Sequence, residues 1–173
     1  MAIVKYSETK FKINLGFLEL ETTWEIDELQ KNAAWEMYVE LATRITTAEL
    51  KENDGLLREA LTSLNSLFAT TRELLKRCGP HIATPGNPKD TTLGHLAVNI
   101  LNKVLRPLLA KWHPLLLDWE QQKPIDKTTK QHELEWEYNK ELREAINEIR
   151  MQLIEYANVL GTVLGVANLI ENN

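Results

Sequence analysis

Four residues near the middle of the chain carry side chains that could together bind a small anion. They are Arg106, Trp112, His113 and Asp118, all within the stretch 106–120. A guanidinium group offers fixed hydrogen-bond donors to a carboxylate or phosphate, and an imidazole ring can gain a proton near neutral pH. An aromatic side chain would supply the apolar wall that small-ligand pockets usually have. The sequence therefore suggests a small-anion pocket lined by these residues.

Two prolines in the same stretch indicate where such a pocket could open. Pro107 and Pro114 are spaced so that they lie on one face of a helix. Each removes one backbone hydrogen bond from a helix interior and can cost about 3 kcal/mol. The resulting bend has two interpretations. Either it opens a cleft for the anion, or it curves the helix around a bundle core with Trp112 and Trp119 as anchors.

The histidines and the cysteine offer little further chemistry. The chain has no Glu-x-x-His pair, no paired cysteines, no phosphate-binding glycine loop and no nucleophile elbow. Only His113 and His132, with Asp118 and Glu133 near them, could meet in a metal site, and this is the one enzymatic hypothesis that remains. Cys78 falls in the last turn of a predicted helix, where the dipole opposes a thiolate. We therefore predict a protein that is not an enzyme and needs no metal or cofactor.

Composition restricts the class of protein. The chain has 173 residues, of which 43% are hydrophobic and 26% charged, as in one globular domain. A net charge of −5 disfavours a dominant basic surface for nucleic acid. The first residues lack a signal-peptide pattern, and no apolar run is long enough to span a bilayer. We expect a cytoplasmic protein of bacterial style that binds neither nucleic acid nor membranes.

Four amphipathic segments predict the helices that must position these residues. Thr22 with Glu25 and Thr128 with Gln131 have the spacing of capping boxes, and Gly79 precedes a proline as at many helix ends. Short connections between long helices are typical of an up-down-up-down antiparallel bundle. We therefore predict an all-α fold, an elongated four-helix bundle that forms a single domain over 1–173. The predicted helices are 23–50, 55–78, 92–120 and 128–170.

The last of these helices is expected to be the spine of the bundle. Its apolar residues recur every eleven residues, which corresponds to about 3.67 residues per turn and a nearly straight helix. An unbroken helix over 128–170 would span roughly 60 Å and extend beyond the other three. Gly161 and Gly165 predict a close approach by another segment, for which the N-terminal arm is the obvious candidate. The repeating residues are Leu134, Tyr138, Leu142, Ala145, Ile149, Leu153, Tyr156, Leu160, Leu164 and Ala167.

The N-terminal residues predict an extended arm over 1–21. Apolar residues alternate with polar ones and share one face, as in a half-buried strand. Residues 3–6 could pair with this strand in a hairpin, although the residues between them lack the usual turn glycine or asparagine. An unpaired strand offers its backbone hydrogen-bonding groups to a second chain. The alternating apolar residues are Phe11, Ile13, Leu15 and Phe17.

These features support two functional hypotheses. The first is a non-enzymatic interaction or scaffolding module, either a homodimer or part of a complex with another protein. It is motivated by the long last helix, the strand-like arm and the absence of a catalytic motif. The alternative is a ligand-sensing or regulatory bundle, with the small-anion pocket at the proline-bent third helix.

Overall fold

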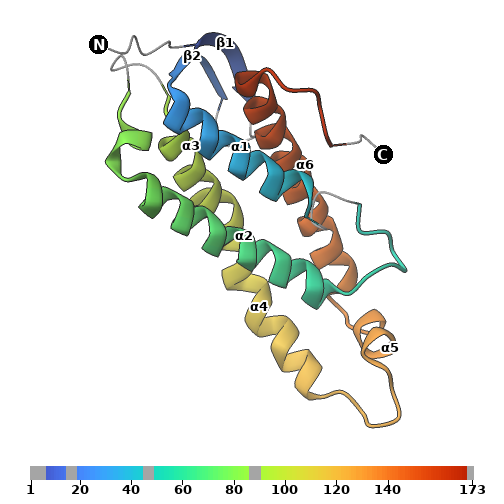
Figure 1. Cartoon of the computed structure of the whole chain (residues 1–173). Coiled ribbons are helices and arrows are strands. Elements are labelled where there is room, and N and C mark those ends of the chain that lie inside the picture. The colour runs from blue at the N-terminus through green and yellow to red at the C-terminus, as the bar shows by residue number, and fades with distance from the viewer. Residues whose placement is uncertain (1–6, 15–18, 45–48, 86–90, 171–173) are drawn as a thin grey trace.

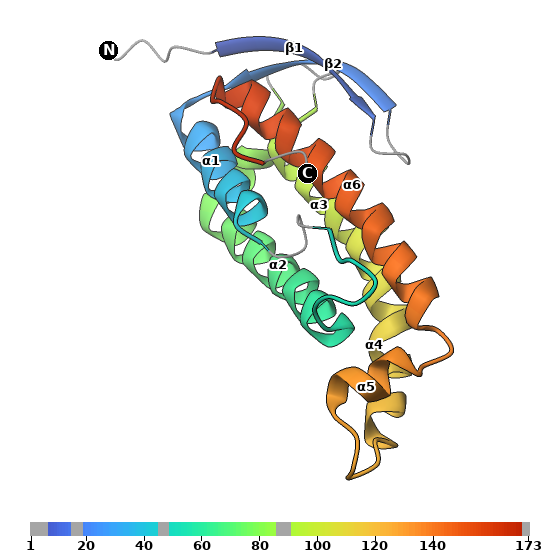
Figure 2. The same cartoon turned by 90° about the vertical axis from the view of Figure 1, so that its right-hand side faces the viewer.

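The computed structural model describes residues 7–14, 19–44, 49–85 and 91–170. Within these residues the body is all helical, and its long helices pack side by side in antiparallel contact (Figure 1). A strand pair lies across one end of the helices (Figure 2). The elements are β1 (Ser7–Asn14), β2 (Glu19–Ile26), α1 (Glu28–Ala42), α2 (Leu57–Cys78), the short 3₁₀ turn η2 (Pro80–Ala83), α3 (Leu93–Asn99), the π-helical segment η3 (Ile100–Leu105), α4 (Arg106–Gln121), α5 (Thr129–Leu134) and α6 (Asn139–Leu164).

The first helix is shorter than the predicted 23–50. Its N-cap is Asp27, whose side chain accepts a hydrogen bond from the Gln30 backbone N–H at 2.9 Å. The residues before Asp27 form β2, so Thr22 does not act as a helix cap. Adjacent threonines and a tryptophan favour a pleated backbone over a helix, which explains this correction. The helix then ends at Ala42, before the predicted boundary.

The second helix matches its prediction closely. It begins at Leu57 and ends at Cys78, and Gly79 follows with a φ of 67°, the left-handed region that glycine adopts readily. Thr71 lies on the apolar seam, and its hydroxyl donates to the Leu67 carbonyl at 2.8 Å. This bond satisfies a buried polar group inside the helix itself.

The third predicted helix, 92–120, consists of three successive pieces. Thr92 caps α3 by accepting from the His95 backbone N–H at 3.1 Å, and the chain then widens into η3 before it continues as α4. Pro107 lies in the first turn of α4, where a missing N–H costs little, and Pro114 alone lies inside α4. A π-helical turn is one of the recognised places where a helix adjusts its course. The chain therefore accommodates the first proline by changing its helix type.

The predicted unbroken helix over 128–170 is wrong. The capping box of Thr128 and Gln131 is confirmed, but α5 ends after six residues and a turn separates it from α6. Leu134 and Tyr138, which the eleven-residue repeat placed on the seam, are 40% and 38% exposed, whereas Trp136 between them is buried. Burial of Trp136 outweighs helix continuity at this point. The helix ends at Leu164 because Gly165 adopts φ 67° and ψ 28°.

The core forms where α1, α2, α3, η3 and α6 pack together. Tyr38 of α1 is fully buried, and its hydroxyl accepts from the Leu169 N–H at 2.7 Å and donates to the Ala167 carbonyl at 3.3 Å. Gly161 lies against the same ring, since a Cβ there would be 3.5 Å from the ring carbon Cε2. Tyr38 of α1 is therefore the described neighbour of Gly161, and β1 of the arm also contacts α6.

The two strands pair antiparallel, from Ser7 opposite Ile26 to Asn14 opposite Glu19. The arm therefore extends beyond its predicted end at 21, and within the described residues the partner of the alternating strand is β2, which follows it in the chain. Residues 3–6, the predicted partner, lie outside the described residues. Phe11 and Ile13 lie in β1, while Leu15 and Phe17 fall outside the described residues. Figure 2 shows the hairpin over the C-terminal part of α6 and the start of α1. Among the helices of the described residues, none combines the length and apolar character needed to cross a membrane.

Candidate functional site

The four residues of the predicted anion pocket contact different parts of the structure. Arg106 is exposed, donates to Asn102 at 3.1 and 3.0 Å and lies 5.2 Å from the centre of the Phe68 ring. Asp118 is exposed on α4. Trp112 is buried, and none of the four lines any of the three cavities described below. The predicted anion pocket is therefore not among the cavities that these described residues form.

Trp112 instead belongs to an aromatic cluster between α4 and the turn that follows α5. Its ring lies 6.0 Å from that of Trp136 and 6.2 Å from that of Tyr138, both edge-on. Such pairs contribute about 0.5–1.5 kcal/mol beyond the area they bury. Trp112 is thus a core anchor, which agrees with the second interpretation of the proline-bent helix.

Trp119 is half-buried and makes a different contact. Its ring stacks on His132 with centres 4.3 Å apart and planes 3° from parallel. Trp119 Nε1 donates to the His132 carbonyl at 2.9 Å, and His132 Nε2 donates to the Trp119 carbonyl at 2.7 Å. These reciprocal bonds join α4 to α5, and they engage Nε2 of His132, so that this nitrogen is not free to bind a metal ion. In the described part of the chain, no group of three or more His, Cys, Asp or Glu side chains is arranged to bind a metal ion.

A buried network of charged side chains lies at the N-terminus of α2. Leu56 occupies the N-cap position and offers no side-chain acceptor. Both carboxylate oxygens of Glu133, 76 residues further along the chain, accept from the Leu57 N–H at 2.9 and 3.0 Å. A helix start leaves N–H groups without partners and carries partial positive charge, so a carboxylate is favoured there. Glu133 of α5 therefore caps α2 from another part of the chain.

Arg143 of α6 compensates the charge of Glu133. Both side chains are almost fully buried, and Arg143 Nη2 lies 3.5 Å from Glu133 Oε1. Its Nη1 donates to the carbonyls of Lys51 at 3.0 Å and Asp54 at 3.1 Å, and its Nε donates to Asn139 Oδ1 at 3.0 Å. Burial raises the pKa of the Glu133 carboxyl, while the Leu57 N–H and Arg143 oppose that rise. The pair holds the connection before α2, the short α5 and the start of α6 together.

A second ion pair continues this network toward α4. Arg58 makes a forked contact with Glu120, with Nε to Oε1 at 2.9 Å and Nη2 to Oε2 at 2.8 Å. Arg58 Nη1 also lies 2.8 Å from Nδ1 of His113, whose Nε2 is buried without a hydrogen-bond partner among the described residues. Burial lowers the pKa of His113 first, and the nearby Arg58 charge lowers it further, while Glu120 partly offsets both. Burial and the Arg58 charge therefore both favour the neutral form of His113 in the folded chain.

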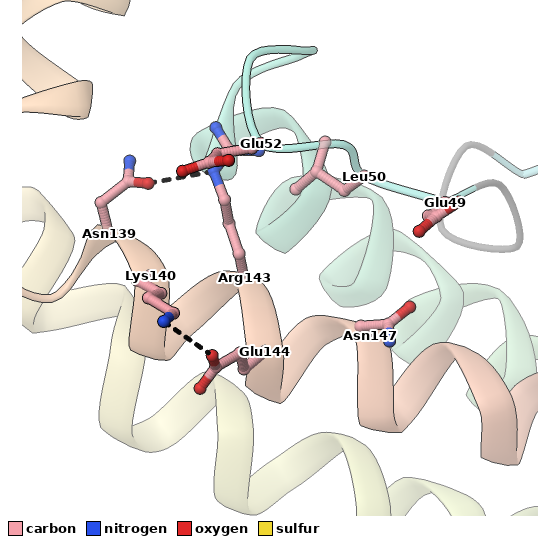
Figure 3. Close-up of a pocket in the computed structure, with 8 residues that line it drawn as sticks. All are labelled: Glu49, Leu50, Glu52, Asn139, Lys140, Arg143, Glu144 and Asn147. Carbon is pink, nitrogen blue, oxygen red and sulfur yellow. Dashed lines mark hydrogen bonds and ion pairs between the residues drawn. The ribbon is translucent and has the colours of Figure 1, made fainter.

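Two cavities flank the pair of Glu133 and Arg143. Figure 3 shows the first, a groove of about 360 Å³ between the segment before α2 and the first turns of α6, with the Arg143 side chain directed toward that segment. The second, of about 240 Å³, lies against Glu133 and the stacked rings of Trp119 and His132. A third, of about 300 Å³, lies beside Tyr38 at the other end of α6. The groove in Figure 3 is lined by Glu49, Leu50, Glu52, Asn139, Lys140, Arg143, Glu144 and Asn147.

The hydrogen bonds around Glu133 and Arg143 indicate a structural role for this pair. A carboxyl with a raised pKa can act as a general acid, but both oxygens of Glu133 are already engaged by the Leu57 N–H. The Arg143 guanidinium is likewise engaged by two carbonyls and Asn139. Cys78, at the opposite end of α2, is partly buried, and burial raises the pKa of its thiol, which disfavours the reactive thiolate. The network therefore holds the molecule together at this end.

The sequence contained one indirect signal of this network. The second helix starts without Ser, Thr, Asp or Asn at its N-cap, so its first N–H groups needed a partner from elsewhere. Glu133 belongs to a run of acidic residues that reads as a solvated face, and nothing in its local spacing distinguishes it from its exposed neighbours. Arg58 and Glu120 are similarly ordinary in sequence, and only the fold brings them together.

Comparisons with protein-family models, with curated proteins and with solved structures found no match to this chain.

Proposed function

We propose that this chain is a non-enzymatic protein-interaction module whose docking element is the β1–β2 hairpin. The observation that carries the proposal is the sheet itself, which within the described residues has two strands and hence two outer edges without a neighbouring strand. Each edge presents unpaired backbone N–H and C=O groups along eight residues. Addition of a strand from another chain would satisfy those groups.

The attachment of the hairpin to the helices supports this role. A two-stranded hairpin is at best marginally stable alone in water, so it needs a packed face. Ile26 at the end of β2 is 1% exposed, and the hairpin contacts α6 through β1 and α1 through β2. The body thus presents the strands in a fixed position at one end, which lowers the ordering cost of binding.

The partner that we favour is a second copy of the chain, joined through β1. Two β2 strands would bring Glu19, Glu21 and Glu25 of each copy together, and like charges across strands are destabilising. Two antiparallel β1 strands centred on residue 10 would place Glu8 opposite Lys12 twice and Lys10 opposite Lys10 once, so two attractive pairs outnumber one repulsive pair. A two-fold contact of this kind closes on itself and gives a homodimer with one four-stranded sheet.

Light scattering after size exclusion tests the proposal. The chain has a mass of 19.9 kDa, and we expect about twice that value for the intact protein. Proline removes a backbone donor, and successive N–H groups of a strand point to opposite edges. Proline should therefore abolish the dimer at every second residue of β1, where the N–H faces the outer edge. The helical circular dichroism signal of these variants should remain. Proline at Thr22 and proline at Thr23 of β2 are the matched controls. One of these two residues directs its N–H to the outer edge of β2, which the proposed dimer does not use, and proline there should leave the dimer intact. A monomeric wild type at high concentration would contradict self-association through the hairpin.

A further inference from the structure

The end of the molecule opposite the hairpin projects beyond the rest of the bundle. We call it the tip, and it consists of residues 113–134: the second half of α4, the connection to α5, and α5 itself. Figures 1 and 2 show α4 and α5 extending past the N-terminal end of α2. The polar contacts that join the tip to α2 are those of Arg58 with His113 and Glu120, and of Glu133 with the Leu57 N–H. The polar part of the attachment of the tip to α2 is thus made by groups that titrate or carry charge, beside the apolar core to which Leu116 belongs.

The geometry fixes the protonation state of His113. An arginine guanidinium can only donate, so Nδ1 of His113 must accept the hydrogen bond from Arg58 Nη1 at 2.8 Å. The ring proton must then reside on Nε2, which is buried and has no acceptor among the described residues. The contact accordingly requires the neutral ring in one tautomer. A protonated ring would place a donor and a positive charge against Arg58.

We propose that His113 is a pH-sensitive latch, and that its protonation releases the tip from the first turns of α2. Two donors cannot share the contact, so either the ring or the guanidinium must move. Movement of Arg58 breaks its fork with Glu120, and movement of the ring removes the contact that His113 makes with α2. Either outcome loosens the contact between the tip and α2. This device is independent of the proposed docking role of the hairpin.

The groups around His113 define the direction of the effect. Arg58 faces it from α2 and Glu120 from its own helix, while Glu133 and Arg143 form the neighbouring pair. Because the pKa of His113 is lowered in the folded chain, the closed contact is fully stable above the ordinary histidine pKa of about 6.5 and weakens as the pH falls below it. Glu133 acts in the opposite sense, since burial raises its pKa and protonation removes a buried charge. Release on acidification is therefore attributable to His113.

Hydrogen exchange on the full chain tests the latch. Protection factors, corrected for intrinsic exchange, are compared at pH 7.5 and 5.0 for amides of 115–134, with those of 153–163 in α6 as the internal reference. In the wild type, protection of 115–134 should fall about tenfold for each pH unit between the ordinary histidine pKa of about 6.5 and the lowered pKa of the closed state, because the two states bind different numbers of protons in that interval. His113→Gln keeps an acceptor for Arg58 and cannot gain a proton, so it should lose less than twofold. His95→Gln, at an exposed histidine of α3, should behave as wild type.

Two results would overturn the proposal: a wild type that keeps its protection at pH 5.0, or equal losses in the wild type and His113→Gln. If His113→Gln fails to fold, nuclear magnetic resonance on the wild type decides the question. The His113 ring should then show the Nε2–H tautomer and titrate below about 6.5, the ordinary histidine value. An Nδ1–H tautomer, or titration at or above that ordinary value, contradicts the latch.

Discussion

The two ends of this molecule are held to the helical body by different forces. At the hairpin end, backbone pairing between β1 and β2 is combined with apolar burial, as Ile26 shows. At the tip, charged groups add to apolar packing such as that of Leu116, with Glu133 and Arg143 buried as a pair. Apolar burial is indifferent to pH, whereas a buried ion pair depends on the protonation of its members. One end is therefore built for constant attachment, and the other responds to its surroundings.

The largest effect is expected from Arg143→Met. This change removes the cation that compensates Glu133, and breaking a buried pair in this way costs about 3–5 kcal/mol of the free energy of unfolding. The difference from wild type should shrink at pH 5.0, because Glu133, whose pKa burial already raises, then gains a proton. Urea unfolding at pH 7.5 and 5.0 measures both quantities.

Arg150→Met is the matched control for that variant. Arg150 lies further along α6 and its Nε donates to Asn147 at 2.9 Å near the surface, so its loss should cost less than about 1 kcal/mol. Equal losses in the two variants, or a loss in Arg143→Met that grows on acidification, would show that the pair is not the main support of the tip.

Ile26→Ala tests the apolar end. Truncation of a fully buried isoleucine costs about 2–5 kcal/mol. Since Ile26 is 1% exposed and closes the hairpin against the body, we also expect the hairpin to loosen and the dimer mass to fall. The loss in free energy of unfolding, measured with urea, should be the same at pH 7.5 and 5.0. A strongly pH-dependent loss would remove the contrast between the two ends; Val98→Ala, at an exposed valine of α3, serves as the control.

Glu120→Gln separates the two parts of the tip network. The pair with Arg58 is about a quarter exposed on each side, so its loss should cost only about 1 kcal/mol. The charge of Glu120 raises the pKa of His113, and its removal should therefore lower that pKa further. A magnetic resonance titration of the ring measures the change. An increase in the pKa would mean that Glu120 does not face His113 in solution.

The smallest expected effect is a gain in stability, and it concerns Tyr156, a residue that belongs to neither the hairpin nor the tip. The hydroxyl of Tyr156 is buried and has no hydrogen-bond partner within the described structure, and burial raises its pKa far above the ordinary tyrosine value. Tyr156→Phe should therefore stabilise the protein by about 1 kcal/mol, measured by urea unfolding. Tyr38→Phe is the matched comparison and should destabilise it, because that hydroxyl makes two hydrogen bonds. A loss of stability in Tyr156→Phe would indicate a partner for its hydroxyl.

The sequence allowed prediction of the elements that follow from local rules, but not of those that depend on contacts between distant segments. The second helix and the capping box at Thr128 follow from local rules, namely apolar periodicity and the pairing of a cap with its own first turn. The turn at 135–138 does not, because the eleven-residue repeat continues through it. What breaks the helix is the burial of Trp136 against Trp112, a contact between segments far apart in sequence.

The candidate site was hidden for the same reason. Arg106, Trp112, His113 and Asp118 have suitable chemistry, but their positions on α4 direct them to different neighbours. His113 alone takes part in the network described above. The partners that give it a role, Arg58 and Glu120, carry no motif, and their meeting depends on the relative rotation of α2 and α4. Rotational positions of packed helices are decided by the whole core.

The π-helical segment η3 sets that rotation. It joins α3 to α4, and its wider turns contain more residues than an α-helix would over the same rise. If the same six residues instead formed an ordinary α-helix, each would turn the chain by about 100°, and everything after the segment would be rotated by about one residue's turn. His113 would then no longer face Arg58, and Trp112 would leave its aromatic neighbours. The helix type of this single segment thus acts as the molecule's angular reference, and a conversion of the segment to α-helix that preserves every residue of α4 would misalign the entire far end.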